Sequence, residues 1–336
     1  MVLAAVSAFS AGAAAQETQD GKKLSAVYVY DGGNAQYRDD DAQSIDQMFY
    51  AFALFKSGRL SVAHWKHFDA FQAYIEKHPH ITPILSVGGW GADGFSRAAA
   101  TEEGRAAFVT DALNIMREYG FLGVDIDWEY PGSSDGGVKS SPHDRENYTL
   151  LLRALREGLD ALTAQDGVPR ILCIALSGSP WLIENLECAE IGAIVDQVCL
   201  MTYDMQMPKL ASHHTALFAA YPKALSADGG VRAYVGAGIP AEKILLGVAF
   251  YGHRWRTKLA EPLYGKATYK DTLTYTQIKK LIDKTPAAVF YDEAAQAPYF
   301  ADGKVFISYD DIRSITHKRL YVRDQGLLGL FAWQYG

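Results

Sequence analysis

Apolar residues are gathered in short blocks along the chain, and polar or mixed segments separate these blocks. Eight runs rich in β-branched and aromatic residues recur between longer segments that have helical spacing or turn residues. Near-continuous apolar runs, as opposed to strictly alternating ones, are typical of parallel strands covered on both faces. The predicted strands are residues 24–30, 48–55, 80–89, 121–127, 170–177, 195–204, 244–252 and 326–334.

Two of the intervening segments carry clear helix signals. Residues 101–120 open with Thr101 and two glutamates and end at Gly120 after Arg117, as capping and the helix dipole favour. Residues 141–162 follow the fourth predicted strand with apolar residues at helical intervals. Strands that alternate with helices in this way predict an α/β protein with a (β/α)8 TIM barrel; an open doubly wound sheet is the alternative.

Residues 257–308 break this rhythm because they are longer than one crossover helix requires. Short runs rich in Tyr and Phe around one helical segment predict a small α+β insertion between strands 7 and 8, within a catalytic barrel of residues 22–336. Such insertions form walls beside barrel active sites. The chain ends three residues after Trp333 with no eighth helix. We therefore expect either a truncated C-terminus or another element in that position.

The N-terminal residues resemble a secretory signal. A short apolar run, residues 2–9, precedes three small residues at 13–15. This pattern predicts a signal peptide over residues 1–15 and a secreted or periplasmic protein. No Lys or Arg precedes the run, so an upstream start and a frayed alanine-rich terminus both remain alternatives. The run is too short to span a bilayer, and because no other run is long enough, a membrane is not an expected partner.

The composition is that of a folded globular protein, with 49% hydrophobic and 21% charged residues. A net charge of -7 and a pI near 5.7 provide no basic surface for a phosphate backbone, so nucleic acid is not an expected partner. Three cysteines, an odd number, argue against a disulfide framework. The sequence has no paired Cys or His spacing typical of zinc.

Three carboxylates, Asp125, Asp127 and Glu129, occupy every second position at the end of the fourth predicted strand. Side chains alternate along a strand, so the three project to one side with successive Cα atoms about 6.6 Å apart. On a half-exposed strand this polar face needs no function, but in a parallel barrel it points into the interior, where an unpaired charge is costly. Neighbouring carboxylates also oppose each other's ionisation. The row therefore predicts a general acid at Glu129, since barrel active sites lie at the carboxyl ends of strands.

The segment GVDIDWEYP, residues 123–131, resembles the signature of the family 18 glycoside hydrolases, the chitinases and their relatives. Further segments are similar to that family's motifs and follow in its order: SVGGW at 86–90, MTYD at 201–204, FYGHRW at 250–255 and GLFAW at 329–333. The resemblance spans about residues 24–333. It implies a monomeric, secreted, retaining hydrolase of β-1,4-linked N-acetylglucosamine in chitin or its oligosaccharides, with no metal or cofactor.

The resemblance also implies residue roles. Glu129 would donate the proton to the glycosidic oxygen. Asp127 would orient the substrate's 2-acetamido group, whose carbonyl oxygen attacks the anomeric carbon, and Asp125 would share a proton with Asp127. Tyr203 would donate to the acetamido oxygen, and Asp204 would help to hold that group. Such substrate assistance is an exception to the scheme in which a second carboxylate is the nucleophile.

Other candidates would bind the sugar chain. Trp333 would form the floor under the distorted sugar, although a tryptophan on a last strand is commonly a core residue. Trp90 is a candidate for stacking a leaving-side sugar or for packing within its loop. The resemblance adds five further residues to the substrate site, which already contains Asp204: Tyr28, Ser86, Met201, Tyr130 and Tyr251.

One position departs from the family pattern. Many relatives have Arg after FYG, whereas this chain has His253. Imidazole lacks the bidentate fork of a guanidinium, so contacts beyond the cleavage site stay open. Two other functions also stay open: a chitin-binding lectin on the same fold, and an endo-β-N-acetylglucosaminidase that acts on N-glycans. The sequence does not distinguish endo from exo action or reveal a preferred chain length.

Overall fold

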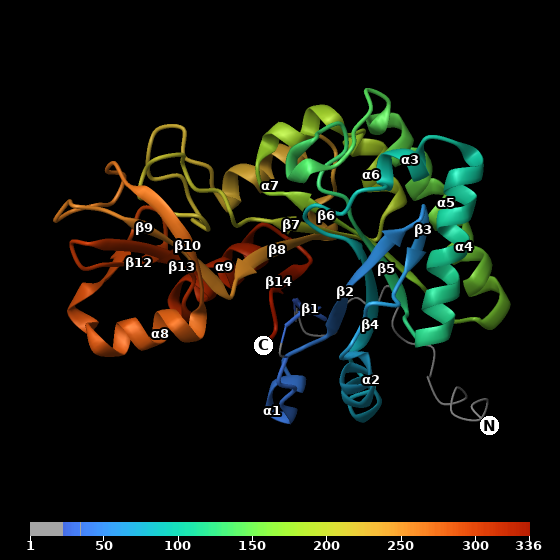
Figure 1. Cartoon of the computed structure of the whole chain (residues 1–336), viewed down its shortest axis with the longest axis horizontal. Coiled ribbons are helices and arrows are strands. Elements are labelled where there is room, and N and C mark those ends of the chain that lie inside the picture. The colour runs from blue at the N-terminus through green and yellow to red at the C-terminus, as the bar shows by residue number, and fades with distance from the viewer. Residues whose placement is uncertain (1–22, 34) are drawn as a thin grey trace. The chain divides into compact units, whose positions relative to one another are not determined.

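The computed structural model describes residues 23–33 and 35–336, which form two compact units (Figure 1). The first unit contains the described residues up to Ile174, together with Asn185–Gln197 and Gly336. The second contains Ala175–Glu184 and Val198–Tyr335. The predicted signal peptide, residues 1–15, lies outside the described residues.

The first unit is built on adjacent parallel strands whose side chains are largely buried on both faces. A short strand, β3, extends this sheet in the antiparallel direction beside β2. Burial on both faces explains why these strands appear in the sequence as continuous apolar runs. The strands are β1 (Leu24–Tyr30), β2 (Gln47–Lys56), β3 (Arg59–Ser61), β4 (Thr82–Gly88), β5 (Gly123–Asp127) and the first part of β6 (Ile171–Ser177).

Helices α4 (Glu102–Tyr119) and α5 (Asp144–Asp166) lie side by side in the first unit (Figure 1). The Thr101 hydroxyl accepts a hydrogen bond from the Gly104 amide and caps α4 at its start, and Gly120 ends α4 in the left-handed region, both as the sequence predicts. The remaining helices of this unit are α1 (Asp39–Ala42), α2 (Phe68–Lys77), α3 (Phe95–Ala99) and α6 (Cys188–Ile194), with a short 3₁₀ turn at Asp135–Gly137.

The second unit contributes three parallel strands, so that eight parallel strands occur along the described chain. β8 pairs with β7 on one side and β14 on the other. The bounds are β7 (Gln197–Met201), β8 (Ile244–Ala249) and β14 (Gly329–Trp333), with helices α7 (Ala227–Gly236) and α9 (Ile312–Asp324). Short 3₁₀ turns occupy Pro180–Asn185, Ala241–Lys243 and Pro286–Ala288.

The region predicted as an insertion contains most of a five-stranded antiparallel sheet, in the order β10-β9-β13-β12-β11. Helix α8 covers this sheet with Ile278, which is fully buried against Leu273, Phe300 and Tyr309. The bounds are β9 (Tyr251–Arg256), β10 (Thr268–Thr274), α8 (Tyr275–Lys284), β11 (Val289–Asp292), β12 (Ala297–Ala301) and β13 (Val305–Tyr309).

Two predicted strands differ from the observed ones. The run 244–252 is predicted as one strand, but β8 ends at Ala249 and β9 begins at Tyr251. The first part pairs with the parallel strands β7 and β14, whereas β9 pairs with the antiparallel strands β10 and β13. The run 195–204 was predicted to reach Asp204, but β7 ends at Met201. The apolar run continues across the first break, so hydrophobicity alone does not reveal it. Within residues 23–33 and 35–336, no helix is both long and apolar enough to cross a bilayer.

Candidate active site

Asp125 and Asp127 lie on β5 and are buried, as the spacing of the acidic row predicts. Their Cα atoms pair in register with Ser86 and Gly88 of β4. Glu129 follows two residues after the strand end and is only partly buried. The row therefore runs from a fully enclosed carboxyl group at Asp125 towards a more accessible one at Glu129.

Asp125 has defined hydrogen-bond donors. The Tyr28 hydroxyl donates to Oδ2 at 2.9 Å and the Ser86 hydroxyl donates to the same oxygen at 2.6 Å. Oδ1 has no hydrogen-bond partner within the described residues. Burial raises the pKa of Asp125 to about 6, against the opposing effect of the two hydroxyl donors. Tyr28 and Ser86, both predicted to line the substrate site, are thus direct partners of this acid.

The end of β4 fixes the backbone of Asp127. Gly89 donates its amide hydrogen to the Asp127 carbonyl oxygen at 2.8 Å. Gly88 has a φ of +115°, and a Cβ atom at this residue would lie 2.2 Å from that same oxygen. No side chain fits at such a distance, so the close approach of the two strands requires glycine. This contact explains the glycine pair in the SVGGW segment.

Two aromatic candidates face each other after these strands. The rings of Trp90 and Tyr130 make an edge contact with centroids 6.3 Å apart. Trp90 is 65% exposed, which does not fit the alternative that it is a packed loop residue. An exposed indole offers a flat apolar face of the kind that stacks on sugars.

Sequence reasoning missed Asp144, which holds the loop after β5 in place. Its side chain is fully buried. Oδ2 accepts hydrogen bonds from the amides of Ser141 at 2.8 Å and Gly132 at 3.2 Å, and Oδ1 accepts one from the Ser96 hydroxyl at 2.7 Å. Asp144 thereby fixes the loop that begins directly after Tyr130. An aspartate in the first turn of a helix was the available signal, but it is a common feature and indicates nothing specific.

The second unit holds the other candidates at the ends of its strands. Met201 is the last residue of β7, and Trp333 is the last residue of β14; both are partly buried. Tyr203 is 8% exposed, and its ring makes edge contacts with Tyr251 and Phe331, each with centroids 6.0 Å apart. These positions are the carboxyl ends at which the sequence places the site.

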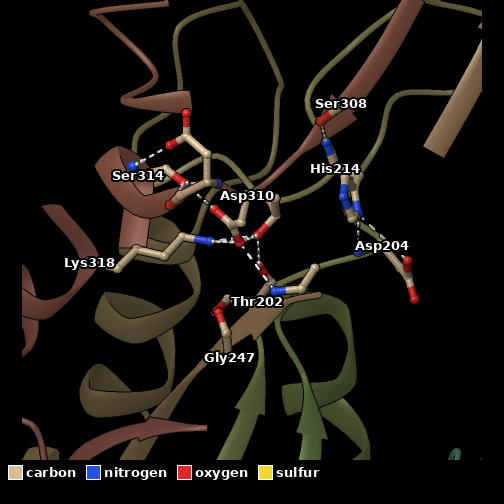
Figure 2. A network of polar contacts seen from close by, with 11 residues as sticks. Thr202, Asp204, His214, Gly247, Ser308, Asp310, Ser314 and Lys318 are labelled. Carbon is tan, nitrogen blue, oxygen red and sulfur yellow. Dashed lines mark hydrogen bonds and ion pairs between the residues drawn. The ribbon is translucent and has the colours of Figure 1, made fainter. Parts of the chain in front are cut away.

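Asp204 is the centre of a polar cluster in this unit. Its Oδ1 accepts hydrogen bonds from the Tyr251 hydroxyl at 2.7 Å and from His253 Nε2 at 2.6 Å. The Asp204 amide donates to His214 Nδ1 at 3.4 Å (Figure 2). Burial raises the pKa of Asp204, but interactions with His214 and His253 outweigh this effect and hold the pKa well below its usual range. Asp204 is therefore ionised at neutral pH.

His214 is a second residue that sequence reasoning missed. The side chain is fully buried, and burial lowers its pKa to about 4 against the attraction of Asp204. A neutral imidazole therefore lies beside an ionised carboxylate at pH 7. His253 also directs its ring at Asp204. The His253 imidazole thus forms a hydrogen bond with the Asp204 carboxylate of the same chain.

The comparisons with known proteins agree with this arrangement. A family model described as "Glycosyl hydrolases family 18" matches residues 25–336. The chain belongs to this family. Chitinase A1 from Niallia circulans is 37% identical over 288 residues, which cover 77% of this chain and 41% of that protein. The chain thus spans less than half of the length of that relative.

Solved structures of family 18 type match nearly the whole chain. A glycoside hydrolase family 18 N-acetylglucosaminidase from Paenibacillus barengoltzii is 36% identical with a TM-score of 0.85, covering 94% of this chain and 96% of that one. A chitinase-like agglutinin from Robinia pseudoacacia is 28% identical with a TM-score of 0.81, covering 92% and 94%. The predicted (β/α)8 barrel and the predicted glycoside hydrolase class are confirmed.

In this family 18 chain, a buried ion pair supports the segment that leads to Tyr203 and Asp204 (Figure 2). Lys318 donates to Asp310 Oδ2 at 2.7 Å and to the Thr215 hydroxyl at 2.6 Å, and both charged side chains are fully buried. The same Asp310 oxygen accepts the Ala249 amide at the end of β8, at 3.1 Å. The Thr215 hydroxyl also lies 3.1 Å from the carbonyl oxygen of Thr202. The network therefore connects α9 to the ends of two parallel strands.

Proposed function

We propose that this chain hydrolyses β-1,4 linkages between N-acetylglucosamine units of chitin or chitooligosaccharides, with retention of configuration and by substrate-assisted catalysis. The acidic row carries the proposal, because Asp125, Asp127 and Glu129 follow one another from a buried strand to its carboxyl end. Two of the similar proteins, one named a chitinase and the other an N-acetylglucosaminidase, support the same substrate class.

In the proposed mechanism, Glu129 donates a proton to the glycosidic oxygen as the bond to the anomeric carbon breaks. The acetamido oxygen of the same sugar attacks that carbon from the opposite face and forms a cyclic intermediate. Glu129, now ionised, removes a proton from water, and the water opens the intermediate with retention. Glu129 suits this double role because it is the most accessible of the three acids.

Asp127 is proposed to hold the acetamido N–H and to stabilise the positive charge that develops on the intermediate. Asp125 is proposed to share a proton with Asp127. A pKa near 6 at Asp125 supports this, because a proton can stay within the pair near neutral pH. With the substrate's own oxygen as nucleophile, no second carboxylate has to attack the sugar.

Residues of the second unit are proposed to bind the substrate. The Tyr203 hydroxyl donates to the acetamido oxygen, and ionised Asp204 holds the group with help from Tyr251. Trp333 forms an apolar floor under the sugar that is distorted, and Met201 lines the site. Trp90 and Tyr130 supply aromatic faces for neighbouring sugars.

The replacement Glu129→Gln tests the proposal. It keeps the size of the side chain but removes the proton donor, so kcat on chitohexaose is expected to fall by about 10²- to 10⁴-fold. Binding of the same oligosaccharide, measured by tryptophan fluorescence, is expected to persist. Glu146→Gln, at an exposed position on α5, is the matched control and should keep full activity. Hydrolysis at the normal rate by Glu129→Gln would show that the acid is assigned wrongly.

A second candidate is a chitin-binding lectin, which the similar fold of the Robinia agglutinin favours. A lectin would bind chitohexaose and release no product over long incubation, so the unsubstituted protein separates these candidates. A third, an endo-β-N-acetylglucosaminidase, would release N-glycans from a glycoprotein and leave chitohexaose intact. Chromatography of the first products from chitohexaose also distinguishes endo from exo cleavage.

We also propose that the protein is exported, secreted or periplasmic, and acts as a monomer. The apolar N-terminal run supports export. Cell fractionation and size-exclusion chromatography with light scattering test the two statements separately. A cytoplasmic product would contradict export, and a dimer mass would contradict the monomer.

A further inference from the structure

Three metal-ligating side chains converge in the second unit. One carboxylate oxygen of Asp204 and one ring nitrogen each of His214 and His253 all lie within 4.8 Å of one another. They come from three separate segments: the turn after β7, the loop that precedes α7, and strand β9. Figure 2 shows the His214 ring directed at Asp204. Among the described residues, this is the one such group of His, Cys, Asp or Glu.

The hydrogen bonds of this cluster leave a position for a cation. The Asp204 amide donates to His214 Nδ1 at 3.4 Å, so the lone pair of Nδ1 is on the side of Asp204. The Asp204 carboxylate oxygen lies 3.7 Å from the same nitrogen. An acceptor nitrogen thus faces an ionised oxygen, an arrangement that repels unless a positive charge lies between them.

The other nitrogens of the two rings are also unsatisfied. His214 Nε2 and His253 Nδ1 are buried and have no hydrogen-bond partner in the part of the chain that the structure describes. Buried polar groups without partners are rare in native proteins and call for an explanation. His214 accepts the Asp204 amide at Nδ1 and therefore presents a lone pair towards the carboxylate. His253 donates to Asp204 through Nε2 and has to give up that proton before it can bind a metal ion.

We propose that Asp204, His214 and His253 form a binding site for one divalent transition-metal ion of the Zn²⁺ class. Two imidazole nitrogens with one carboxylate are the donors that Zn²⁺, Cu²⁺ and Ni²⁺ prefer, whereas Ca²⁺ and Mg²⁺ prefer sets of oxygens. The Nδ1 atom of His214 accepts the Asp204 amide and so has a lone pair available for a metal ion. The Asp204 side chain is 54% exposed, so the ion can enter from solvent and keep water as a further ligand.

Metal binding replaces a hydrogen bond at His253. Its Nε2 now lies 2.6 Å from Asp204 Oδ1, too close for an ion bound to both atoms at about 2.0 Å with tetrahedral angles. Two ligands at that distance and angle lie about 3.3 Å apart, so the ring nitrogen and the carboxylate oxygen must separate by about 0.7 Å. The proton between them moves to His253 Nδ1 or, if that nitrogen already carries one, to water. No other bond changes, and the metal keeps its oxidation state.

The functional consequence rests on the proposed function. If Asp204 holds the acetamido group, an ion bound to its carboxylate excludes that group. The metal is then an inhibitor that competes with the oligosaccharide, so KM rises with metal concentration while kcat stays constant. His253 is the residue that creates this sensitivity, because an always-charged guanidinium at its position could not ligate a cation.

The test begins with direct binding, which needs no activity. Isothermal titration of metal-stripped protein without a histidine tag is expected to show one Zn²⁺ per chain, and added Co²⁺ should give the visible absorption of a four-coordinate site. His253→Gln and Asp204→Asn are each expected to weaken Zn²⁺ binding at least tenfold. His317→Gln, on α9, is the matched control and should bind like the unsubstituted protein. Far-UV circular dichroism checks that each variant is folded.

Failure to bind Zn²⁺, or equal binding by the His253→Gln and unsubstituted proteins, would overturn the site. Mg²⁺ at a hundredfold excess should not compete, and displacement of Zn²⁺ by Mg²⁺ would also count against it. Assays on chitohexaose then test the consequence, with inhibition expected in the unsubstituted protein and lost in His253→Arg. If metal-free protein hydrolyses no substrate, the proposed function fails, while the titration still decides the metal site.

Discussion

At the scale of single residues, Asp125 combines complete burial with hydrogen bonds from the Tyr28 and Ser86 hydroxyl groups to one of its oxygens. Two hydroxyl groups stabilise a carboxylate less than a cation would, so desolvation dominates and the pKa rises to about 6. Asp204 shows the opposite balance, since His214 and His253 outweigh the effect of burial and lower its pKa. The two aspartates therefore favour different protonation states near neutral pH, as acid–base chemistry requires.

Buried Asp125 is expected to make the folded protein less stable as the pH rises. Its folded-state pKa lies about two units above that of an unfolded chain, so the folded protein binds the proton more tightly. Stability from this group is complete below pH 4 and is lost as the pH rises through 6, by up to roughly 3 kcal/mol. Asp125→Asn cannot ionise and should lose this pH dependence. Urea unfolding at pH 4.5 and pH 7.5 measures the change in the free energy of unfolding between these pH values. An equal change in Asp125→Asn and in the unsubstituted protein would refute the assignment.

At the scale of elements, the active-site geometry depends on how closely β4 approaches β5. The Gly88 backbone lies against the Asp127 carbonyl, and the Gly89 amide donates to that oxygen. This contact sets where β5 ends relative to β4 and thus where the acidic row emerges. Asp144 then fixes the loop that follows through Ser141 and Gly132.

Gly88→Ala is predicted to damage both stability and activity. The new Cβ would lie 2.2 Å from a backbone oxygen that cannot rotate away, so the strands must separate. Gly120→Ala is the matched control, because Gly120 also has positive φ but nothing within 4 Å of an added Cβ. Its cost should be about 1–2 kcal/mol for the left-handed backbone alone. Gly88→Ala should cost more and lower kcat at least tenfold; similar losses in the two variants would contradict the close-contact argument.

At the scale of the whole molecule, the features predicted from sequence are those that repeat locally. The strands and the row Asp125, Asp127 and Glu129 follow from periodicity within a few residues. His214 and His253 could not be assigned in this way, because they lie 10 and 49 residues from Asp204 and meet it only through the fold. A zinc motif is recognised in a sequence by Cys or His residues at short, fixed spacing. The cluster of Asp204, His214 and His253 has no such spacing, because its members are brought together only by the tertiary fold.

The buried ion pair is the clearest tertiary feature, since Lys318 lies 103 residues from Thr215 and 8 from Asp310. Burial lowers the pKa of Lys318 against the attraction of Asp310, yet the 2.7 Å contact supports a charged pair. Lys318→Met would leave Asp310 buried and uncompensated, which costs roughly 3–5 kcal/mol. Lys280→Met, exposed on α8, is the control and should cost under about 0.5 kcal/mol.

The double variant Lys318→Met with Asp310→Asn separates charge from packing. If the uncompensated carboxylate is the main cost, removing its charge should restore part of the stability lost in Lys318→Met. Urea unfolding gives the free energy of unfolding of Lys318→Met, of Asp310→Asn and of the double variant. Equal or additive losses would instead mean that Lys318 acts by filling space. Because Asp310 also accepts the Ala249 amide at the end of β8, Lys318→Met is also expected to weaken oligosaccharide binding.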